Sequence, residues 1–456
     1  MAKRSLLASN LGVASGTLAS RLTGLARVVI FAAVIGQTAL ADAFDIGNNA
    51  PNVVYELLLG GTLTAALVPL FSQFRQRNDR EATAAVFGVS LIGAALITVA
   101  AVLLAPWIFR LYSLSPAADA AEFHTLGGAL TRVFLIQIFF YALNALVAAM
   151  LNANDRFVAA AWAPVASNLV AIGALGAIWQ THSGGAVGLV DAPVGSQIFW
   201  LFSAGPTAGI AVMALVVLAI AVRFDAVPAP TLKFSHPAVR QLLSLSGWAV
   251  GYIAANQVAL VVVKNLTEPG SGQLDAYAKA MTIFQLPHGL LAVTIATTTA
   301  PILARAAAGG DVSAFSARFA SSARMTIALT LPCSIVLFVF AEPVVRAVLG
   351  WGAFSDDAVT LTAEALTGLS LGLVGFSLYL FALRGFYSHG DTRTPFFINL
   401  FENLLNIVLA LALVDRYGVH GLGIAFAVAY MVSAVVAVSV LRRAHGTPGL
   451  VALLRR

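Results

Sequence analysis

The sequence predicts an all-α polytopic membrane protein with twelve transmembrane helices in two six-helix lobes, and its composition, its apolar pattern and its basic residues support this class. Hydrophobic residues make up 59% of the 456 residues and charged residues only 10%, whereas a water-soluble domain carries roughly 25% charged residues. The apolar runs are continuous and do not alternate, which disfavours a β-barrel. They follow one another along the whole chain, so no interval is long enough for a polar domain.

Twelve apolar segments reach the length that a membrane-spanning helix requires, which is about 20 residues for a hydrocarbon core of about 30 Å. We place them near residues 8–35, 43–74, 85–110, 128–151, 157–179, 197–222, 241–266, 276–304, 319–349, 360–386, 395–414 and 420–441. The first segment contains Arg21 and Arg27 and is too long for the apolar part of a signal peptide, so we expect an uncleaved helix.

Lysine and arginine residues in the connecting loops predict the orientation. With the N-terminus on the cytoplasmic side, the inner segments hold seventeen of them and the outer loops hold Arg416 alone. The inner set consists of Lys3, Arg4, Arg75, Arg77, Arg80, Arg156, Arg223, Lys233, Arg240, Arg305, Arg318, Arg384, Arg393, Arg442, Arg443, Arg455 and Arg456. Because cytoplasmic loops are enriched in these residues, both termini are predicted to be cytoplasmic. The net charge of +6 is spread over short loops, so no nucleic-acid partner is expected.

The two halves of the sequence resemble each other, which predicts an internal repeat. Three pairs of segments match in the same order at nearly the same offset: 42–44 with 275–277, 61–69 with 293–301, and 151–168 with 386–403. The alternative is chance similarity between apolar helices. It would readily explain a single match, but it is less able to explain three matches in the same order at nearly the same offset. Six spans separate the copies, an even number, so the halves keep one orientation and are related by a pseudo-two-fold axis along the membrane normal. We expect an N-terminal lobe at 1–225 and a C-terminal lobe at 226–456, which rock about a central cavity.

Two arginines in the first span predict a binding site for an anionic group. An ionisable side chain at membrane depth costs at least a few kcal/mol and usually faces a cavity or a partner. Arg21, Gly24 and Arg27 step by three along the helix, and Ser20 shares a face with Arg27. The planar guanidinium suits a phosphate group, which it binds through two parallel hydrogen bonds. The alternative is an ion pair with an acidic residue of the second span, and the two arrangements can coexist.

The second and eighth spans also carry groups that are unusual in a membrane helix. Asp45 and Glu56 of the second span are the acidic residues that would pair with the arginines. Between them, residues 47–52 contain glycine, proline and amide side chains and end at Asn52. Non-helical backbone is tolerated at membrane depth only where it lines protein or water, so this segment is predicted to be a hinge or part of the site. The eighth span repeats the pattern around Lys279.

The eleventh span carries a polar stripe, because Asn399, Glu402, Asn403 and Asn406 are spaced i, i+3, i+4 and i+7. Their carboxylate and amide oxygens would coordinate a cation, and hydrogen bonding between helices is the alternative.

No cofactor or metal cage is expected, since Cys333 is the one cysteine and no two of the seven histidines are spaced i, i+4. No nucleophile with a base and no nucleotide loop is evident, so an enzyme is not expected.

Motifs throughout the chain point to a known family. Those of the first two spans are Ser20-Arg21-Leu-Thr-Gly24-Leu-Ala-Arg27, Ala41-Asp42-Ala-Phe44, Pro51-Asn52-Val-Val-Tyr-Glu-Leu-Leu-Leu-Gly-Gly61 and Val68-Pro69. Leu151-Asn152, Phe284-Gln-Leu-Pro-His-Gly289 and Gly385-Phe-Tyr-Ser388 follow later. Together they resemble the MurJ (MviN) family of lipid II flippases, which belongs to the multidrug/oligosaccharidyl-lipid/polysaccharide exporter superfamily. The Tyr-Glu-Leu-Leu-Leu-Gly-Gly form is similar to the actinobacterial branch.

This resemblance implies a function and a set of site residues. A family member would move lipid II, an undecaprenyl-pyrophosphate-linked peptidoglycan precursor, from the inner to the outer leaflet of the bacterial inner membrane by alternating access. It would thereby serve cell-wall synthesis and cell shape. The family's essential arginines correspond to Arg21 and Arg27, and its aspartate after that helix corresponds to Asp42. The predicted substrate-binding set is Ser20, Arg21, Arg27, Asp42, Asn52, Glu56 and Lys279.

The sequence departs from the family pattern in two ways. The family's arginine after the Pro-Asn of span 2 and its Asp-Arg pair in span 8 are replaced by Tyr55-Glu56 and Met281-Thr282, so Lys279 is expected to take over the second cationic role. Members usually carry fourteen spans, of which the last two form a groove for the lipid tail. The twelve spans expected here would lack that pair.

Two alternatives stay open. A multidrug or cation exporter, or a flippase for another lipid-linked polysaccharide, would share the superfamily fold, and an exporter of cations should have a cavity dominated by carboxylates. A non-transporting scaffold for cell-wall enzymes would leave the arginines at depth unexplained. For a flippase we expect lipid II, membrane lipids and cell-wall synthesis proteins as partners. The membrane potential, sodium or protons would drive it, with the Glu402 stripe as the coupling site, and a charge that crosses 100 mV gains roughly 2.3 kcal/mol.

Overall fold

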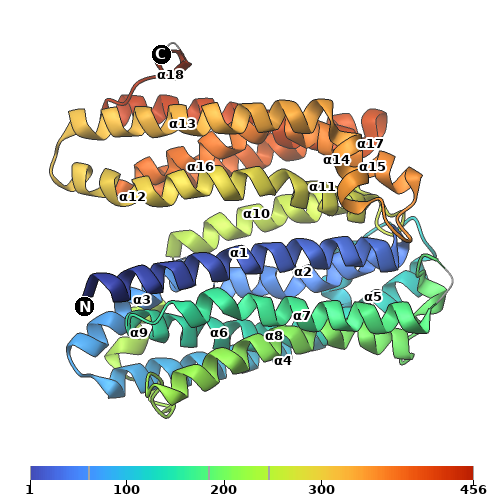
Figure 1. Ribbon diagram of the computed structural model, residues 1–456, viewed down its shortest axis with the longest axis horizontal. Helices are drawn as coiled ribbons and strands as arrows, with labels where there is room; N and C mark the ends of the chain where they lie inside the picture. Colours follow the sequence, from blue (N-terminus) through green and yellow to red (C-terminus); the bar gives the residue numbers. More distant parts are fainter. Residues whose placement is uncertain (1, 60–61, 183–184, 245–246, 455–456) are drawn as a thin grey trace. The chain divides into compact units, whose positions relative to one another are not determined.

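Every regular element of the computed structural model is helical within the residues that it describes, which are 2–59, 62–182, 185–244 and 247–454 (Figure 1). Side chains are described for 11–54, 67–182, 185–241 and 254–453. The predicted all-α class is confirmed. Contacts divide the chain into two units: unit 1 comprises Met1–Val250 and Trp351–Phe354, and unit 2 comprises Gly251–Gly350 and Ser355–Arg456.

Unit 1 is a bundle of long helices with short connections. Its elements are α1 (Ala2–Ile35), α2 (Ala39–Leu59), α3 (Thr62–Gln76), α4 (Arg80–Leu111), α5 (Ala120–Leu135), α6 (Gln137–Ala153), α7 (Val158–Thr181), the short 3₁₀ turn η1 (Leu189–Asp191), α8 (Gln197–Arg223) and α9 (Pro237–Ser244). α7 packs against both α1 and α8, and α6 packs against α3 and α8. A Cβ atom on Gly209 of α8 would lie 2.7 Å from the Ser167 carbonyl oxygen of α7. Small residues thus allow the close backbone approach that membrane helices use in place of a hydrophobic driving force.

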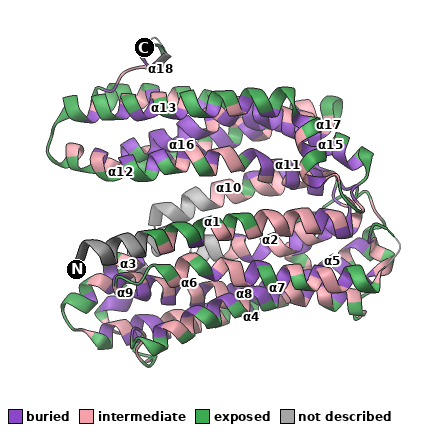
Figure 2. Ribbon diagram, viewed as in Figure 1, coloured by how far each residue is buried: buried purple, intermediate pink, exposed green. Residues whose placement is uncertain are grey.

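Unit 2 also consists of helices packed along their length. Its elements are α10 (Gly247–Leu266), whose first residues precede the unit boundary, α11 (Gln273–Pro287), the π-helical turn η2 (His288–Ala292), α12 (Val293–Ala308), α13 (Val312–Val339), α14 (Ala341–Leu349), α15 (Asp356–Ser370), α16 (Leu373–Ser388), α17 (Arg393–His445) and α18 (Leu450–Leu454). Buried side chains of α12, α13, α16 and α17 form a core cluster, which includes Phe319, Tyr379 and Phe386. Figure 2 shows the buried residues on the helix faces that lie against neighbouring helices.

Helix α17 contains a reversal of the chain. It runs for 53 residues, and its backbone leaves the helical conformation at Gly418, where φ is 54° and ψ is −138°. A straight helix places residues eight apart about 12 Å from each other. Nevertheless, a Cβ atom on Gly421 would lie 2.6 Å from the Leu413 carbonyl oxygen. α17 therefore folds back on itself, and the ring of His445 at its end stacks on that of His389, which precedes its start, with centroids 3.6 Å apart.

Eight helices of the described residues are long and apolar enough to cross a membrane, or up to nine if α15 and α16, which meet at a 50° bend, form one span. The predicted multi-pass membrane protein is therefore confirmed in class. By this criterion of helix length and hydropathy, α17 counts as one span despite the reversal at Gly418. The helices α2, α3 and α10 do not meet it.

The helix break expected at residues 47–52 of the second span is absent. Residues 47–52 are helical within α2, with Pro51 inside the helix, so the prediction of a non-helical hinge there is wrong. Proline removes one backbone hydrogen bond, yet α2 stays helical through Pro51. One turn earlier α2 packs closely on α5, where a Cβ atom on Gly47 would lie 2.9 Å from the Thr131 hydroxyl. In the eighth span the irregular backbone is present, because α11 ends at Pro287 and the π-helical turn follows.

The C-terminal end of α1 is held by two loops. The Val187 N–H donates to the Ile35 carbonyl at 3.0 Å, and the Ala353 N–H donates to the Ala33 carbonyl at 2.8 Å. The last carbonyls of a helix have no partner within it, so both loops satisfy groups that the helix leaves open. The second of these loops is the segment Trp351–Phe354, which belongs to unit 1 although the chain on either side of it belongs to unit 2.

Candidate substrate and cation sites

Arg27 lies beside a hydrogen-bonded pair of side chains from two other helices. The Tyr141 hydroxyl of α6 is hydrogen-bonded to the Asn52 side chain of α2, and Arg27 of α1 interacts electrostatically with the same tyrosine. All three residues are partly buried. The structure thus brings together two of the predicted residues, Arg27 and Asn52, and adds Tyr141, which the sequence analysis missed.

Tyr141 belongs to a ladder of polar contacts between α2 and α6. Gln137 precedes Tyr141 by one helical turn, and Asn48 precedes Asn52 by one turn. Gln137 Nε2 donates to Asn48 Oδ1 at 3.4 Å and to Thr207 Oγ1 of α8 at 3.1 Å. The ladder therefore has a buried rung anchored to a third helix and a second rung beside the arginine. Polar pairs spaced i, i+4 in both helices are the sequence signal that could have revealed it.

The preceding part of α1 is fastened to α7 through Asn168. Its Nδ2 atom donates to the Ser20 carbonyl at 3.2 Å and to Thr23 Oγ1 at 3.0 Å. Gly24 faces the same amide, since a Cβ atom there would lie 3.6 Å from Asn168 Nδ2. Arg21, one turn earlier, is exposed. Ser20 thus takes part through its backbone, and the two arginines flank the face that α1 turns toward α7.

Asp42 is completely buried in the first turn of α2. A carboxylate at this position complements the partial positive charge of a helix N-terminus. Asp42 therefore has a structural role in α2 in addition to the role predicted from the family. Glu56 lies in the same helix, but its side chain is outside the described residues.

Lys279 forms an ion pair with Asp275, one turn earlier on α11. The two side chains are 4% and 2% exposed. Attraction between such buried charges offsets the cost of removing both from water, and loss of one partner leaves the other uncompensated. The ammonium group of Lys279 is thus already matched, and it would bind an anion only by exchanging Asp275 for it.

The polar stripe of α17 contacts α10. Asn399 and Asn403 both donate to the Asn256 Oδ1 atom, at 3.0 and 2.9 Å. Asn403 also donates to the Asn399 carbonyl at 2.9 Å. Part of the stripe therefore joins two helices by hydrogen bonds, and Asn256 is a partner that the sequence analysis did not find.

Oxygen atoms of the same stripe have no donor among the described side chains. Asn399 Oδ1, Glu402 Oε2 and Asn406 Oδ1 are buried without a hydrogen-bond partner there, and Glu402 is only 1% exposed. Tyr277 of α11 interacts electrostatically with Glu402. A buried polar group without a partner is costly, and carboxylate and amide oxygens are the ligands that hard cations take. The arrangement suits a bound cation, or a proton on Glu402.

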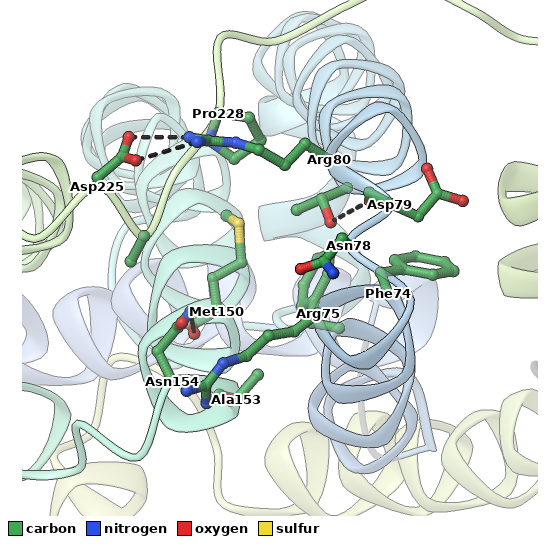
Figure 3. A pocket seen from close by; sticks show the side chains of 13 residues that line it. Phe74, Arg75, Asn78, Asp79, Arg80, Met150, Ala153, Asn154, Asp225 and Pro228 are labelled. Carbon is green, nitrogen blue, oxygen red and sulfur yellow. Dashed lines mark hydrogen bonds and ion pairs between the residues drawn. The ribbon is translucent and has the colours of Figure 1, made fainter.

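Arginine side chains tie three loops together around a cavity of about 170 Å³ at one end of unit 1 (Figure 3). Arg80, at the start of α4, donates two hydrogen bonds to the Asp225 carboxylate after α8, at 3.0 and 2.8 Å. Arg75, near the end of α3, donates to the Ala153 carbonyl at the end of α6, at 2.6 Å. The Arg80 guanidinium lowers the pKa of Asp225 below its ordinary value. These loop cations, which the charge pattern assigned to the inner face, therefore fasten loop ends to one another.

Long apolar helices that carry a half-buried guanidinium in unit 1, and a buried ion pair and a carboxylate oxygen without a donor among the described side chains in unit 2, are the features of a multi-pass membrane transporter. The chain belongs to the lipid II flippase MurJ family, whose model matches residues 31–454. A probable lipid II flippase MurJ of Rhizobium meliloti is 31% identical over 431 residues, which cover 92% of this chain and 78% of the relative. A lipid II flippase MurJ of Burkholderia cenocepacia is 29% identical over 394 residues, which cover 84% and 74%. The family expected from the motifs is confirmed, and it is a family of transporters rather than enzymes.

Solved structures share the fold. A lipid II flippase MurJ in an inward closed conformation matches with a TM-score of 0.78 at 22% identity, over 97% of this chain and 89% of that one. An inward-facing multidrug resistance MATE family transporter of the MOP superfamily matches with a TM-score of 0.76 at 18% identity, over 95% of both chains. The fold is therefore common to both transporter families, and the residues in the interior must distinguish their cargo.

Proposed function

We propose that this protein is a lipid II flippase of the bacterial inner membrane, which carries the undecaprenyl-pyrophosphate-linked peptidoglycan precursor from the inner to the outer leaflet. The family match supports the activity. The structural observation that carries the proposal is Arg27 beside the Asn52–Tyr141 pair. The pyrophosphate of lipid II is a charged group that cannot cross a hydrocarbon core unaided, and a guanidinium with hydrogen-bonding neighbours replaces its hydration.

The other predicted residues take roles that follow from their positions. Arg27 and Arg21 hold the pyrophosphate, with Asn52 as a polar neighbour and Ser20 fixing α1 against α7. Asp42 stabilises the N-terminus of α2. Glu56 lies in the same helix and stays a predicted substrate-binding residue, since its side chain is outside the described residues. Lys279 contributes only when its ion pair with Asp275 opens. Cell-wall synthesis proteins are expected to accept the cargo on the outer side.

We infer twelve spans in two six-helix lobes, at 1–225 and 226–456, which alternate access to a central cavity. Nine candidate spans, with α15 and α16 taken together, become twelve when α17 is counted as two arms about Gly418, α2 with α3 as one span and α10 as another. The excess of loop cations on one side supports cytoplasmic termini.

Translocation of lipid II by the purified protein in liposomes tests the function. Arg27→Ala should slow translocation about 10- to 100-fold, because a charge-assisted hydrogen bond contributes roughly 1.5–3 kcal/mol. Arg27→Lys keeps the positive charge but loses the planar guanidinium that makes two parallel hydrogen bonds. Its translocation rate should therefore lie between those of Arg27→Ala and the parent protein. Arg77→Ala, in an exposed loop, is the control. Wild-type transport of a cationic dye without transport of lipid II would instead identify an exporter, and absence of any transport would leave a scaffold.

We propose further that the Glu402 stripe couples transport to a cation, either sodium or a proton, in addition to the membrane potential. The buried oxygen atoms of Asn399, Glu402 and Asn406 support this proposal, and Asn403 positions the stripe through Asn256. Liposomes with an imposed sodium gradient, proton gradient or potential separate the three driving forces. Glu402→Gln should retain lipid II binding and lose the response to the coupling ion, whereas Glu364→Gln, which is exposed, should keep it. An unchanged ion response in Glu402→Gln would contradict the coupling role.

A further inference from the structure

We propose that Tyr141 is a substrate-binding residue, which with Arg27 and Asn52 forms a three-sided clamp on the pyrophosphate, and that Gln137 is the residue that positions it. The proposal rests on the proposed function, because it assigns further residues to the site of the same cargo. The clamp draws one side chain from each of α1, α2 and α6. No single helix could present three polar groups to one phosphate from different sides.

The chemistry of the three groups fits an anion. The guanidinium supplies a delocalised charge and several donors, and the amide supplies N–H groups. The phenol hydroxyl both donates and accepts hydrogen bonds, so Tyr141 can contact Asn52 and a phosphate oxygen together. The tyrosine also brings no negative charge into the site at neutral pH, since its ordinary pKa is about 10. An acidic side chain at the same place would neutralise the arginine and weaken anion binding.

The two rungs of the ladder differ in a way that separates positioning from binding. Gln137 is 1% exposed and hydrogen-bonds both Asn48 and Thr207, so the first rung links α2, α6 and α8. Thr207 is itself fixed by the Ser203 carbonyl at 3.0 Å. The second rung, Tyr141 with Asn52, is partly exposed and interacts with Arg27. The buried Gln137, with its partners satisfied, sets the register of α2 on α6, and the half-buried rung of Tyr141 and Asn52, which lies beside Arg27, meets the ligand.

The test measures binding of two probe lipids, undecaprenyl pyrophosphate and undecaprenyl monophosphate, to the full chain in lipid nanodiscs. Tyr141→Phe keeps the ring and removes only the hydroxyl. It should weaken binding of the pyrophosphate lipid about tenfold, as expected for one hydrogen bond to a charged group, and binding of the monophosphate lipid by a smaller factor. Tyr430→Phe, a similarly buried tyrosine of unit 2, is the matched control and should change neither. Wild-type pyrophosphate affinity in Tyr141→Phe would overturn the proposal.

A double-mutant cycle with Arg27→Lys and Tyr141→Phe separates binding from folding. Two groups that grip the same phosphate should give a combined loss smaller than the product of the separate losses, whereas independent effects multiply. Gln137→Leu should reduce the pyrophosphate preference as Tyr141→Phe does, although Gln137 touches no ligand. A purely multiplicative cycle would contradict a shared phosphate. If the wild-type chain bound neither lipid, the proposed function itself would fail, which is distinguishable from a failure of Tyr141 alone.

Discussion

In each of the two units an asparagine side chain joins two helices, but the charged residues near this contact are of opposite sign in the two units. Asn168 of α7 donates to the Ser20 carbonyl and Thr23 of α1, and Asn403 of α17 donates to Asn256 of α10. The sequence alignment of 151–168 with 386–403 places these two asparagines at equivalent positions. In each unit an amide thus fastens a later helix to the first one. The contact is retained while the residues around it differ.

The difference lies in the charges near that contact. In unit 1 the first helix carries Arg27, which lies beside the hydrogen-bonded side chains of Asn52 and Tyr141. In unit 2 the first helix carries Asn256 and faces a stripe with Glu402, whose buried oxygen atoms lack donors among the described side chains. A cationic interior suits an anionic cargo, and an interior rich in oxygen suits a cation. One helical framework can therefore supply a cargo site in one unit and a coupling site in the other.

The largest effect on stability should follow from the buried ion pair of unit 2. Asp275→Asn leaves the Lys279 ammonium buried without its counter-charge, which costs about 3–5 kcal/mol. The melting temperature in detergent should fall strongly, and adding Lys279→Met should recover most of it, because the double variant has no isolated charge. A mild effect of Asp275→Asn alone would show that water or another group already reaches the lysine.

The loop at the C-terminal end of α1 that contains Gly352 should be sensitive to a single methyl group. Gly352 has a φ of 61°, and a Cβ atom there would lie 2.4 Å from the Ala33 carbonyl oxygen. Gly310 in unit 2 has a similar φ of 67° with nothing within 4 Å. Gly310→Ala should cost only the backbone strain, about 1–2 kcal/mol, and Gly352→Ala should cost more, because the loop must also leave α1. Equal melting temperatures of the two variants would show that the loop yields without loss.

The equivalent asparagines should show whether the two contacts are equally important. Asn168→Leu and Asn403→Leu each leave buried or half-buried partners without a donor, at about 1–3 kcal/mol. Asn168→Leu should also weaken lipid binding, since it loosens the helix that carries Arg27. Asn403→Leu should weaken the response to the coupling ion and leave lipid binding intact. If both variants impaired the same step, the assignment of separate roles to the units would be wrong.

The sequence predicted the helical class and the family, and it singled out Arg27 as a candidate, because apolar runs and a charge inside one of them are visible along a single helix. It did not predict the partners. Tyr141 lies one helical turn after Gln137 and Asn256 lies beside Gln257, so polar neighbours are visible in the sequence, but their significance depends on which helix packs against them. The same limit explains the wrong hinge in the second span: proline at position 51 suggests a break, but α2 continues through it as a helix that packs closely on α5 at Gly47. The reversal of α17 depends on Gly418, one of 38 glycines.

The smallest effect should come from the exposed carboxylates at the ends of two long helices. Arg80 lowers the pKa of Asp225 in unit 1 through hydrogen bonds and its charge, and the backbone N–H of Ala314 lowers the pKa of Asp311 at the start of α13 in unit 2. Since both folded-state pKa values lie below the unfolded ones, each group stabilises the fold above the unfolded pKa and loses this effect as the pH falls through the folded pKa. Asp225→Asn and Asp311→Asn should therefore lower the melting temperature slightly at pH 7 and not at strongly acidic pH.

Salt should diminish the effect of Asp225→Asn on the melting temperature, because an exposed ion pair is screened. It should leave the effect of Asp311→Asn largely unchanged, because a helix cap consists of short hydrogen bonds. The same salt dependence for both would show that the Arg80 contact contributes no more than a cap.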